Sequence, residues 1–186
     1  MDVIETIEKR RALRSLMPVE ITWDLVLDLA RAASLAPSCF NKQPWRFVFV
    51  YDSEQLERMH SALSQGNEWA RDASMIIAVF SRLDLDCKIM GRFYYLFDTG
   101  MATSFLILRA TELGLVAHPI AGFNEDKVKE ILEIPEDMIV ITLVMIGKHS
   151  EMVSSILNKD QAKAEKERPE RMAIEEFVYR DRYLPK

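Results

Sequence analysis

Residues 36–50 have the sequence APSCFNKQPWRFVFV and join a helix, a loop and a strand. The helix ends at Ala36, because a residue that precedes a proline is disfavoured in the helical region. Two prolines, Pro37 and Pro44, then stiffen a polar loop. The residues that follow Arg46, up to Tyr51, are aromatic or β-branched, which is typical of a strand. This stretch therefore predicts a stiff polar loop that leads directly into a sheet.

The loop carries neutral side chains that can both donate and accept hydrogen bonds. Ser38 offers a hydroxyl, and Asn41 and Gln43 offer carboxamides, which suit the edge of a polar heterocycle such as a flavin or a pyrimidine. The alternative is a turn in which Ser38 and Asn41 bond their own backbone. Cys39 lies in the same loop, but no sequence pattern supplies the base that a cysteine nucleophile needs.

Hydrophobic periodicity predicts the elements on either side of this stretch. Residues 23–35 have apolar side chains at helical spacing, and residues 74–80 form a continuous apolar run typical of a buried strand. Residues 91–113 are apolar on nearly every face, which indicates a helix buried on all sides, inside a domain or in a subunit interface. Residues 150–171 are charged and poorly periodic and predict an extended arm. Further helices are expected from Asp2 into the arginines at 10–14, at 53–64 and at 124–132, and further strands at 115–120 and 138–146.

Composition excludes several classes of protein. The chain has 186 residues, 49% of them hydrophobic, so we expect one packed α/β domain. Its net charge of -5 argues against non-specific nucleic-acid binding, which needs a basic surface. The two cysteines, Cys39 and Cys87, have no CxxC spacing, and the three histidines lie far apart, so neither a zinc site nor a disulfide framework is indicated.

The N-terminus and the apolar segments predict a cytoplasmic protein. The sequence MDVIETIEKRR has acids where a signal peptide needs a basic start and then an apolar run. The uncharged core of the most apolar segment, residues 99–108, is far shorter than the ~20 residues that a membrane span needs.

Two basic groups can form an anion site. Arg10, Arg11 and Arg14 place three guanidinium groups within five residues, which can grip a phosphate bidentately. Arg168 and Arg171 form a second basic pair that can complete such a site. The alternatives are a solvated patch at a helix C-terminus, where positive charge favours the helix dipole, and a solvated tail.

Residues 118–123, HPIAGF, form a short uncharged loop after an expected strand. Such a loop can lie flat against an aromatic ring with its backbone N–H groups free to donate; the alternative is an ordinary turn with a glycine at positive φ. The motifs GxGxxG, GxxxxGK[ST], HExxH and GxSxG do not occur in the sequence, so dinucleotide, triphosphate, zincin and serine-hydrolase interpretations have no support.

In order and spacing, these segments resemble the FMN-dependent nitroreductase family. The resemblance rests on RRALR, on residues 36–50, on DTGMATSFLILRATELGL at 98–115, on HPIAGF and on the late basic pair. It implies an α+β fold with a central mixed sheet wrapped by helices, a single FMN-binding domain over residues 1–186, and an intertwined homodimer. In that dimer the helix 91–113 is the central interface helix, and residues 150–186 form a C-terminal arm that packs on the partner chain.

The resemblance also assigns the FMN contacts. The phosphate and ribityl chain fall to Arg10, Arg11, Ala12 and Arg14, together with Arg171 or Arg168. The loop over the ring, supplied by the partner chain, consists of Pro37, Ser38, Cys39, Asn41 and Gln43. The segment beneath the ring consists of Pro119, Ile120, Ala121 and Gly122, with Ala121 at a position where some relatives have Glu. Gly66 and Trp69 fall where larger members have polar ring contacts, and Asn67 is the substitute that this sequence offers.

The implied activity is a ping-pong reaction, in which NADH or NADPH reduces the flavin and a small acceptor such as a nitroaromatic or a quinone reoxidises it. Because the flavin carries the chemistry, no catalytic side chain and no metal is expected. Two alternatives remain open: a non-catalytic flavin-binding protein, and a specialised flavoenzyme of the same fold, such as a dehydrogenase or a dehalogenase-like enzyme.

Overall fold

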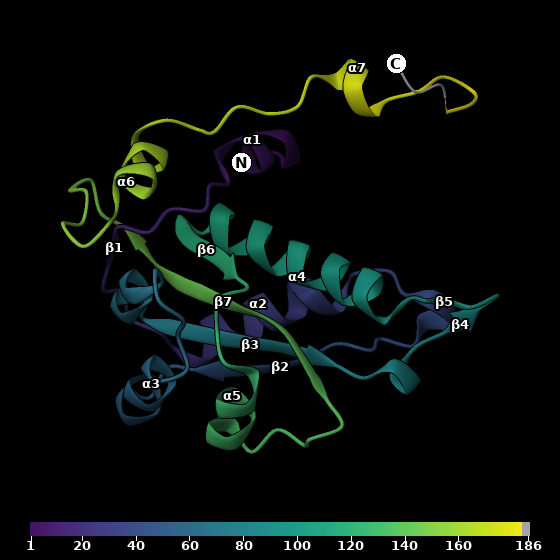
Figure 1. The fold of residues 1–186 in the computed structure, drawn as a ribbon, viewed down its shortest axis with the longest axis horizontal. Coiled ribbons are helices and arrows are strands. Elements are labelled where there is room, and N and C mark those ends of the chain that lie inside the picture. Colours follow the sequence, from purple (N-terminus) through teal and green to yellow (C-terminus); the bar gives the residue numbers. More distant parts are fainter. Residues whose placement is uncertain (184–186) are drawn as a thin grey trace.

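The computed structural model describes residues 1–183 as an α+β fold around one five-stranded sheet (Figure 1). The two central strands are β3 (Met75–Ser81) and β7 (Ile139–His149). β2 (Arg46–Val50) pairs with β3 at one edge, and β6 (Leu115–Ile120) pairs with β7. β1 (Leu16–Met17) pairs with the last two residues of β7. A separate hairpin consists of β4 (Lys88–Ile89) and β5 (Arg92–Phe93).

The predicted class, a sheet wrapped by helices, is confirmed, but the expectation of mixed strand directions is wrong for the described residues. Every strand pair in residues 1–183 is antiparallel. A parallel pair needs a crossover that carries the chain back along the whole strand. Between β6 and β7 the short helix α5 (Glu125–Leu132) instead turns the chain at one end of the sheet, so β7 returns antiparallel to β6.

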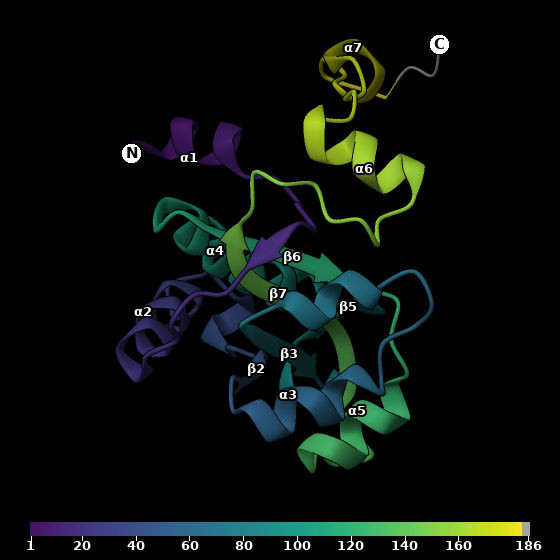
Figure 2. The ribbon, with the colours of Figure 1, turned by 90° about the vertical axis from the view of Figure 1, so that its left-hand side faces the viewer.

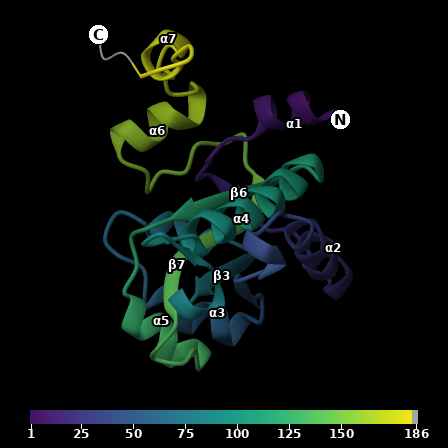
Figure 3. The same cartoon turned by 90° about the vertical axis from the view of Figure 1, so that its right-hand side faces the viewer.

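Helices cover both faces of the sheet (Figures 1–3). Alternate residues of β3 point to opposite faces, as the pleat requires. Met75, Ile77 and Val79 pack with α2 (Trp23–Ser34) and α4 (Tyr95–Glu112), whereas Ile76, Ala78 and Phe80 pack with α3 (Ser53–His60) and α5. The remaining helices are α1 (Val3–Lys9), α6 (Lys159–Lys166), α7 (Ile174–Phe177) and the 3-10 turns η1 (Cys39–Asn41), η2 (Glu68–Asp72) and η3 (Leu83–Leu85).

The helix α4 is not buried on all sides within one chain, so of the two environments expected for residues 91–113, the inside of a domain and a subunit interface, one chain does not supply the first. It begins at Tyr95, after the β4–β5 hairpin, and buries one face that includes Ala102, Leu106 and Ala110. On another face Phe97 is 64% exposed and Phe105 is 40% exposed. A single chain therefore leaves part of this apolar helix in water.

Two further expectations are corrected near the termini. The first helix does not reach Arg14: α1 ends at Lys9, and Arg10 has non-helical backbone angles. The segment 150–171 is not wholly extended, because α6 begins at a capping box formed by Asn158 and Gln161. Beyond α6 the chain runs away from the sheet as an arm that carries α7 (Figure 1). The last residues of the expected arm, 184–186, lie outside the described residues.

Within residues 1–183, no helix is both long enough and apolar enough to cross a lipid bilayer.

Candidate functional site

The five arginines of the predicted phosphate site line one cavity. Arg10, Arg11 and Arg14 come from the extended segment between α1 and β1, and Arg168 and Arg171 come from the chain after α6. The cavity has a volume of about 250 Å³ and is completed by Ala12, Ala164 and Pro169. We call these eight residues the basic cavity. Two segments that lie more than 150 residues apart in the sequence thus meet, close to where α6 passes the N-terminal segment (Figure 2).

Two of the five arginines hold the cavity together. The Nη2 atom of Arg11 donates to the carbonyl of Ala164 at 2.5 Å, in the last turns of α6. In the other direction, the Nη2 atom of Arg168 donates to the carbonyl of Arg10 at 3.0 Å and also to that of Glu8. These crossed contacts fix the N-terminal segment against α6.

A buried carboxylate that the sequence analysis missed anchors the same segment. Glu165 is 6% exposed, and its two carboxylate oxygens accept the backbone N–H groups of Arg14, at 2.6 Å, and Ser15, at 3.0 Å. Gln161, one turn earlier on α6, donates from Nε2 to the carbonyl of Gly66 at 2.9 Å. The available signal was the capping box at Asn158 and Gln161, which predicts a helix here and places Gln161 and Glu165 on one face.

The remaining arginines leave the cavity strongly cationic. Burial, followed by the charges of Arg168 and Arg171, lowers the pKa of Arg10. Burial also lowers the pKa of Arg14, against the opposing effect of Glu165. Among residues 1–183, the side chains of Arg10, Arg14 and Arg171 have no hydrogen-bonding or ion-pair partner, although Arg14 lies 5.8 Å from the ring centre of Trp69. Unpaired like charges of this kind are relieved by an anion with several oxygen atoms.

His118 is a packed histidine that supports the basic cavity from the sheet side. It is 6% exposed, and its ring lies 4.6 Å from that of Trp69. Its Nδ1–H group donates to the carbonyl of Leu13 at 3.0 Å. Burial first, and then the charges of Arg14 and Arg10, lower the pKa of His118 to about 4, although the Leu13 contact and Glu165 act in the opposite direction. The imidazole is therefore neutral at neutral pH and holds the backbone at Leu13.

The segment 119–122 presents an uncharged surface next to this histidine. Pro119 and Ala121 are exposed, whereas Ile120 points into the core. The carbonyl of Gly122 accepts from the Ser64 N–H at 3.1 Å and from Asn67 Nδ2 at 2.9 Å. A Cβ atom at position 122 would lie 2.4 Å from Asn67 Nδ2, so a side chain here would displace the Asn67 amide from its present position.

The contacts to the Gly122 carbonyl determine which polar groups near residues 119–122 are free to bind a ligand. The amide of Asn67 is used to hold Gly122, and Trp69 is only 1% exposed. The Gly122 N–H, by contrast, has no acceptor in the described part of the chain. One of the backbone N–H groups that the sequence analysis expected to be free in residues 118–123 is therefore unpaired in the described residues.

The loop 37–43 is shaped by its own backbone. Phe40, Asn41 and Gln43 have positive φ values of 48°, 56° and 51°. Ser38 Oγ accepts the Gln43 N–H at 3.0 Å, so the hydroxyl makes the local turn contact that was one of the two interpretations. Asn41 is exposed, and its carboxamide has no hydrogen-bonding partner within residues 1–183. It is the free amide that this loop offers to a ligand.

One chain does not bring this loop to the other predicted site residues. The Cys39 N–H donates at 2.6 Å to Asp98, in the first turn of α4, so the loop lies at the N-terminal end of that helix. The start of α1 lies against Leu108, Arg109 and Glu112 near the C-terminal end of α4, and the basic cavity follows directly after α1. A helix of 18 residues spans about 27 Å, and in Figure 1 the β4–β5 hairpin lies at the start of α4, away from α1 and α6.

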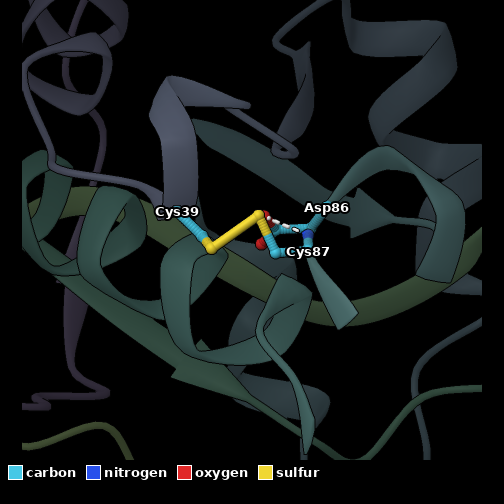
Figure 4. Close-up of side chains that lie close together, drawn as sticks. All are labelled: Cys39, Asp86 and Cys87. Atoms are coloured by element: carbon cyan, nitrogen blue, oxygen red, sulfur yellow. Dashed lines mark hydrogen bonds between the residues drawn. A yellow bond between two sulfur atoms is a disulfide. The ribbon is translucent and has the colours of Figure 1, made fainter. Parts of the chain in front are cut away.

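A disulfide joins Cys39 to Cys87, which contradicts the expectation that the cysteines are unconnected (Figure 4). Their Cα atoms are 6.0 Å apart although 48 residues separate them in sequence. Two cysteines without a spacing motif do not reveal such a contact, because it depends on the loop 37–43 and the segment before β4 both packing at the start of α4. The bond fixes the loop covalently to that segment.

A cationic cavity beside a helix-covered sheet has the chemistry that suits an anionic ligand, and comparison with known proteins identifies the family. Residues 7–68 and 64–148 match the Nitroreductase family. A candidate NADH dehydrogenase/NAD(P)H nitroreductase from Methanothermobacter thermautotrophicus is 30% identical over 156 residues, covering 81% of this chain and 79% of the relative. A solved structure described as an oxidoreductase containing FMN has a TM-score of 0.85 at 30% identity, covering 100% of this chain and 95% of that one.

An iodotyrosine deiodinase from Haliscomenobacter hydrossis is 27% identical, covering 83% of each chain. The chain belongs to the nitroreductase family, and the resemblance found in the sequence is confirmed. An oxidoreductase is the coarse functional class that this membership supports.

Proposed function

We propose that this protein is an FMN-dependent oxidoreductase that uses NADH or NADPH to reduce small acceptors such as nitroaromatics and quinones. The observation that carries the proposal is the basic cavity, where five arginines from two distant segments meet in a chain of the nitroreductase family. The phosphate of FMN is a dianion with three oxygen atoms, which suits several guanidinium groups at once.

The residues present fit FMN at both ends of the molecule. At the phosphate end, Arg10, Arg14 and Arg171 are unpaired among the described residues, and burial, followed by the charges of Arg168 and Arg171, lowers the pKa of Arg10. At the ring end, the N–H of Gly122 is unpaired in the same part of the chain, next to the uncharged surface of Pro119 and Ala121. When bound, FMN supplies two-electron transfer from the nicotinamide to the acceptor in two successive half-reactions.

The side chains of this chain bind and orient and do not move protons. Arg10, Arg14 and Arg171 hold the phosphate, with Arg11 and Arg168 keeping the cavity closed through their contacts to backbone carbonyls. The Gly122 N–H donates to the edge of the ring. His118 is neutral and donates to Leu13, so it positions the cavity and is not a general acid.

We further infer that two chains form the complete site. The free carboxamide of Asn41 lies toward the opposite end of α4 from the basic cavity, so one chain cannot close a loop over its own ligand. The exposed Phe97 and Phe105 of α4 and the 57% exposed Phe177 of the arm need a partner surface. A homodimer that buries α4 against its copy covers these exposed aromatic residues. It also lays loop 37–43 of each chain over the basic cavity of the other.

Anaerobic reduction of the flavin-loaded protein tests the proposed activity. We expect a yellow protein whose flavin absorbance is bleached by NADH or NADPH and restored by one turnover of a nitroaromatic or a quinone. A yellow protein that is inert to both nicotinamides would be a flavin-binding protein without this activity. A colourless protein that does not bind added FMN would overturn the proposal altogether.

Reductive dehalogenation is a second candidate activity, favoured by the 27% identity to the iodotyrosine deiodinase. In that case the acceptor is a halogenated phenol, and halide is released as the flavin is reoxidised. Measuring iodide release from iodotyrosine by the reduced protein, next to reoxidation by a nitroaromatic, decides between the two. Faster reoxidation by iodotyrosine with stoichiometric iodide would replace the nitroreductase activity with this one.

A further inference from the structure

Two sulfur atoms and two carboxylates meet at the N-terminal end of α4, outside the flavin contacts proposed for Gly122 and the basic cavity. Cys39 comes from η1, Asp86 and Cys87 lie between η3 and β4, and Asp98 lies in the first turn of α4. One ligand atom each from Cys39, Asp86 and Cys87 lies within 4.8 Å of the other two (Figure 4). Asp86 is 9% exposed, Cys87 is 8% exposed and Asp98 is 1% exposed.

The carboxylate oxygens of this cluster outnumber the N–H groups that donate to them. Asp86 Oδ1 accepts the Cys87 N–H at 2.7 Å, and Asp98 Oδ2 accepts the Cys39 N–H at 2.6 Å. Asp86 Oδ2 is buried and has no hydrogen-bonding partner within residues 1–183. A cation next to Asp86 Oδ2 would give this buried oxygen a partner.

We propose that the reduced protein binds one Zn²⁺ ion through the thiolates of Cys39 and Cys87 and through Asp86 Oδ2. Thiolate sulfur favours Zn²⁺ over Mg²⁺ and Ca²⁺, which prefer oxygen ligands. Zn²⁺ takes sulfur at about 2.3 Å and carboxylate oxygen at about 2.0–2.2 Å. Two ligand atoms that bind one such ion therefore lie at most about two bond lengths apart. The three ligand atoms of this cluster lie within 4.8 Å of one another, which is close to that separation. A water fills the fourth position of the tetrahedron.

The disulfide and the metal site are two forms of the same cluster. Reduction by a phosphine breaks the S–S bond: the phosphine is oxidised to its oxide with the oxygen of one water, and the two protons of that water go to the two thiols. Zn²⁺ then binds as those two thiols release their protons. Both forms tie the loop 37–43 to the segment before β4, so the loop keeps its anchor when the disulfide is lost.

Native mass spectrometry of the full, flavin-loaded chain tests the proposal. The protein is reduced with a phosphine, freed of reductant without oxygen, and titrated with ZnCl₂. We expect the reduced protein to gain one zinc per chain with the loss of two protons, and the oxidised protein to gain none. Substituting Co²⁺ for Zn²⁺ should give the electron paramagnetic resonance signal of a tetrahedral high-spin ion. Failure of the reduced protein to retain zinc, or equal retention by the oxidised protein, would overturn the proposal.

Variants assign the ligands. Cys87→Ser should abolish zinc retention, and Asp86→Asn should weaken zinc binding at least about tenfold. Glu57→Gln serves as the matched control, because Glu57 is an exposed carboxylate beside His60, at 3.1 Å, on α3; its zinc titration should equal that of the wild type. Zinc binding that survives Cys87→Ser would refute the site. The comparison of oxidised and reduced wild-type protein decides the matter even where a variant does not fold.

Discussion

The basic cavity and the loop 37–43 belong to the same proposed site, yet the chain builds them in different ways. The basic cavity is assembled within one chain: Arg11 bonds α6, Arg168 bonds the N-terminal segment, and Glu165 holds the backbone at Arg14. The loop is anchored at its base by Asp98, by the bond to Cys87 and by Arg46, whose Nη1 donates to the Gln43 carbonyl, whereas its residue Asn41 is exposed. The phosphate end is thus preorganised by the chain itself, whereas we propose that the loop 37–43 reaches a ligand only on a second chain.

The strongest test of this difference is a charge on the exposed face of α4. Phe105→Glu should abolish the soluble dimer, because an unpaired carboxylate in an apolar interface costs about several kcal/mol. Light scattering and size-exclusion chromatography report the outcome. Leu83→Glu, at a residue with the same 40% exposure on η3, should remain dimeric. Leu106→Glu should prevent folding outright, since Leu106 is fully buried within the chain. A soluble, flavin-loaded Phe105→Glu monomer would contradict the two-chain site.

Removing Glu165 should loosen the basic cavity from inside. Glu165→Ala leaves the N–H groups of Arg14 and Ser15 without an acceptor, at about 1–3 kcal/mol for each buried donor. Urea unfolding should show that loss, and FMN affinity should fall with it. Glu167→Ala, at an exposed residue just beyond α6, should leave the unfolding free energy unchanged. Equal stability of the two variants would show that Glu165 does not organise the cavity.

A single arginine of the basic cavity should matter for the ligand and not for the fold. Arg10→Ala or Arg14→Ala removes one charge-assisted contact worth about 1.5–3 kcal/mol, so FMN should bind about tenfold to a hundredfold more weakly. Flavin fluorescence during titration of the flavin-free protein measures the affinity. Arg31→Ala, on the exposed side of α2, is the control with no expected effect. Unchanged affinity in both cavity variants would remove these arginines from the site.

The buried His118 should give the cavity a measurable dependence on pH. Its folded pKa of about 4 lies below the unfolded value of 6.5, so the unfolded chain binds a proton that the folded chain excludes. This contribution to stability is complete above pH 6.5 and is lost as pH falls toward 4, amounting to about 2 kcal/mol between pH 7 and pH 5. The difference in unfolding free energy between these pH values should shrink by that amount in His118→Asn. An unchanged difference would place His118 outside the core.

The sequence predicted most of the sheet because its strands have local signals. The apolar run at 74–80 and the aromatic and β-branched residues after Arg46 became β3 and β2 nearly at their expected ends. The end of α1 was placed too late, since Arg10 to Arg14 are good helix formers. Contacts with distant residues, among them Glu165 with Arg14 and His118 with Leu13, hold this segment out of the helix. These contacts join residues more than 100 positions apart, which no local pattern reports.

For the candidate site, too, the sequence predicted the residues that have a local signal and missed those that depend on distant contacts. The arginines were identified by their type and spacing, and the structure places all five in one cavity. Glu165 was missed because a single Glu in a charged segment is usually solvated. The Cys39–Cys87 bond was missed because it depends on where the start of α4 lies. Whether the arginines and the loop bind FMN stays a prediction.

A heterodimer of two variants tests most directly whether two chains share each site. One chain carries Arg10→Ala and the other Asn41→Leu, with different affinity tags so that only mixed dimers are purified. Asn41→Leu alone should slow flavin reduction by up to about tenfold, because it removes one hydrogen bond to the ring. If the loop serves the partner chain, one site of the mixed dimer carries both lesions and the other carries neither. Stopped-flow reduction should then show one site per dimer with wild-type FMN affinity and wild-type rate. The absence of any wild-type site would mean that each chain builds its site alone.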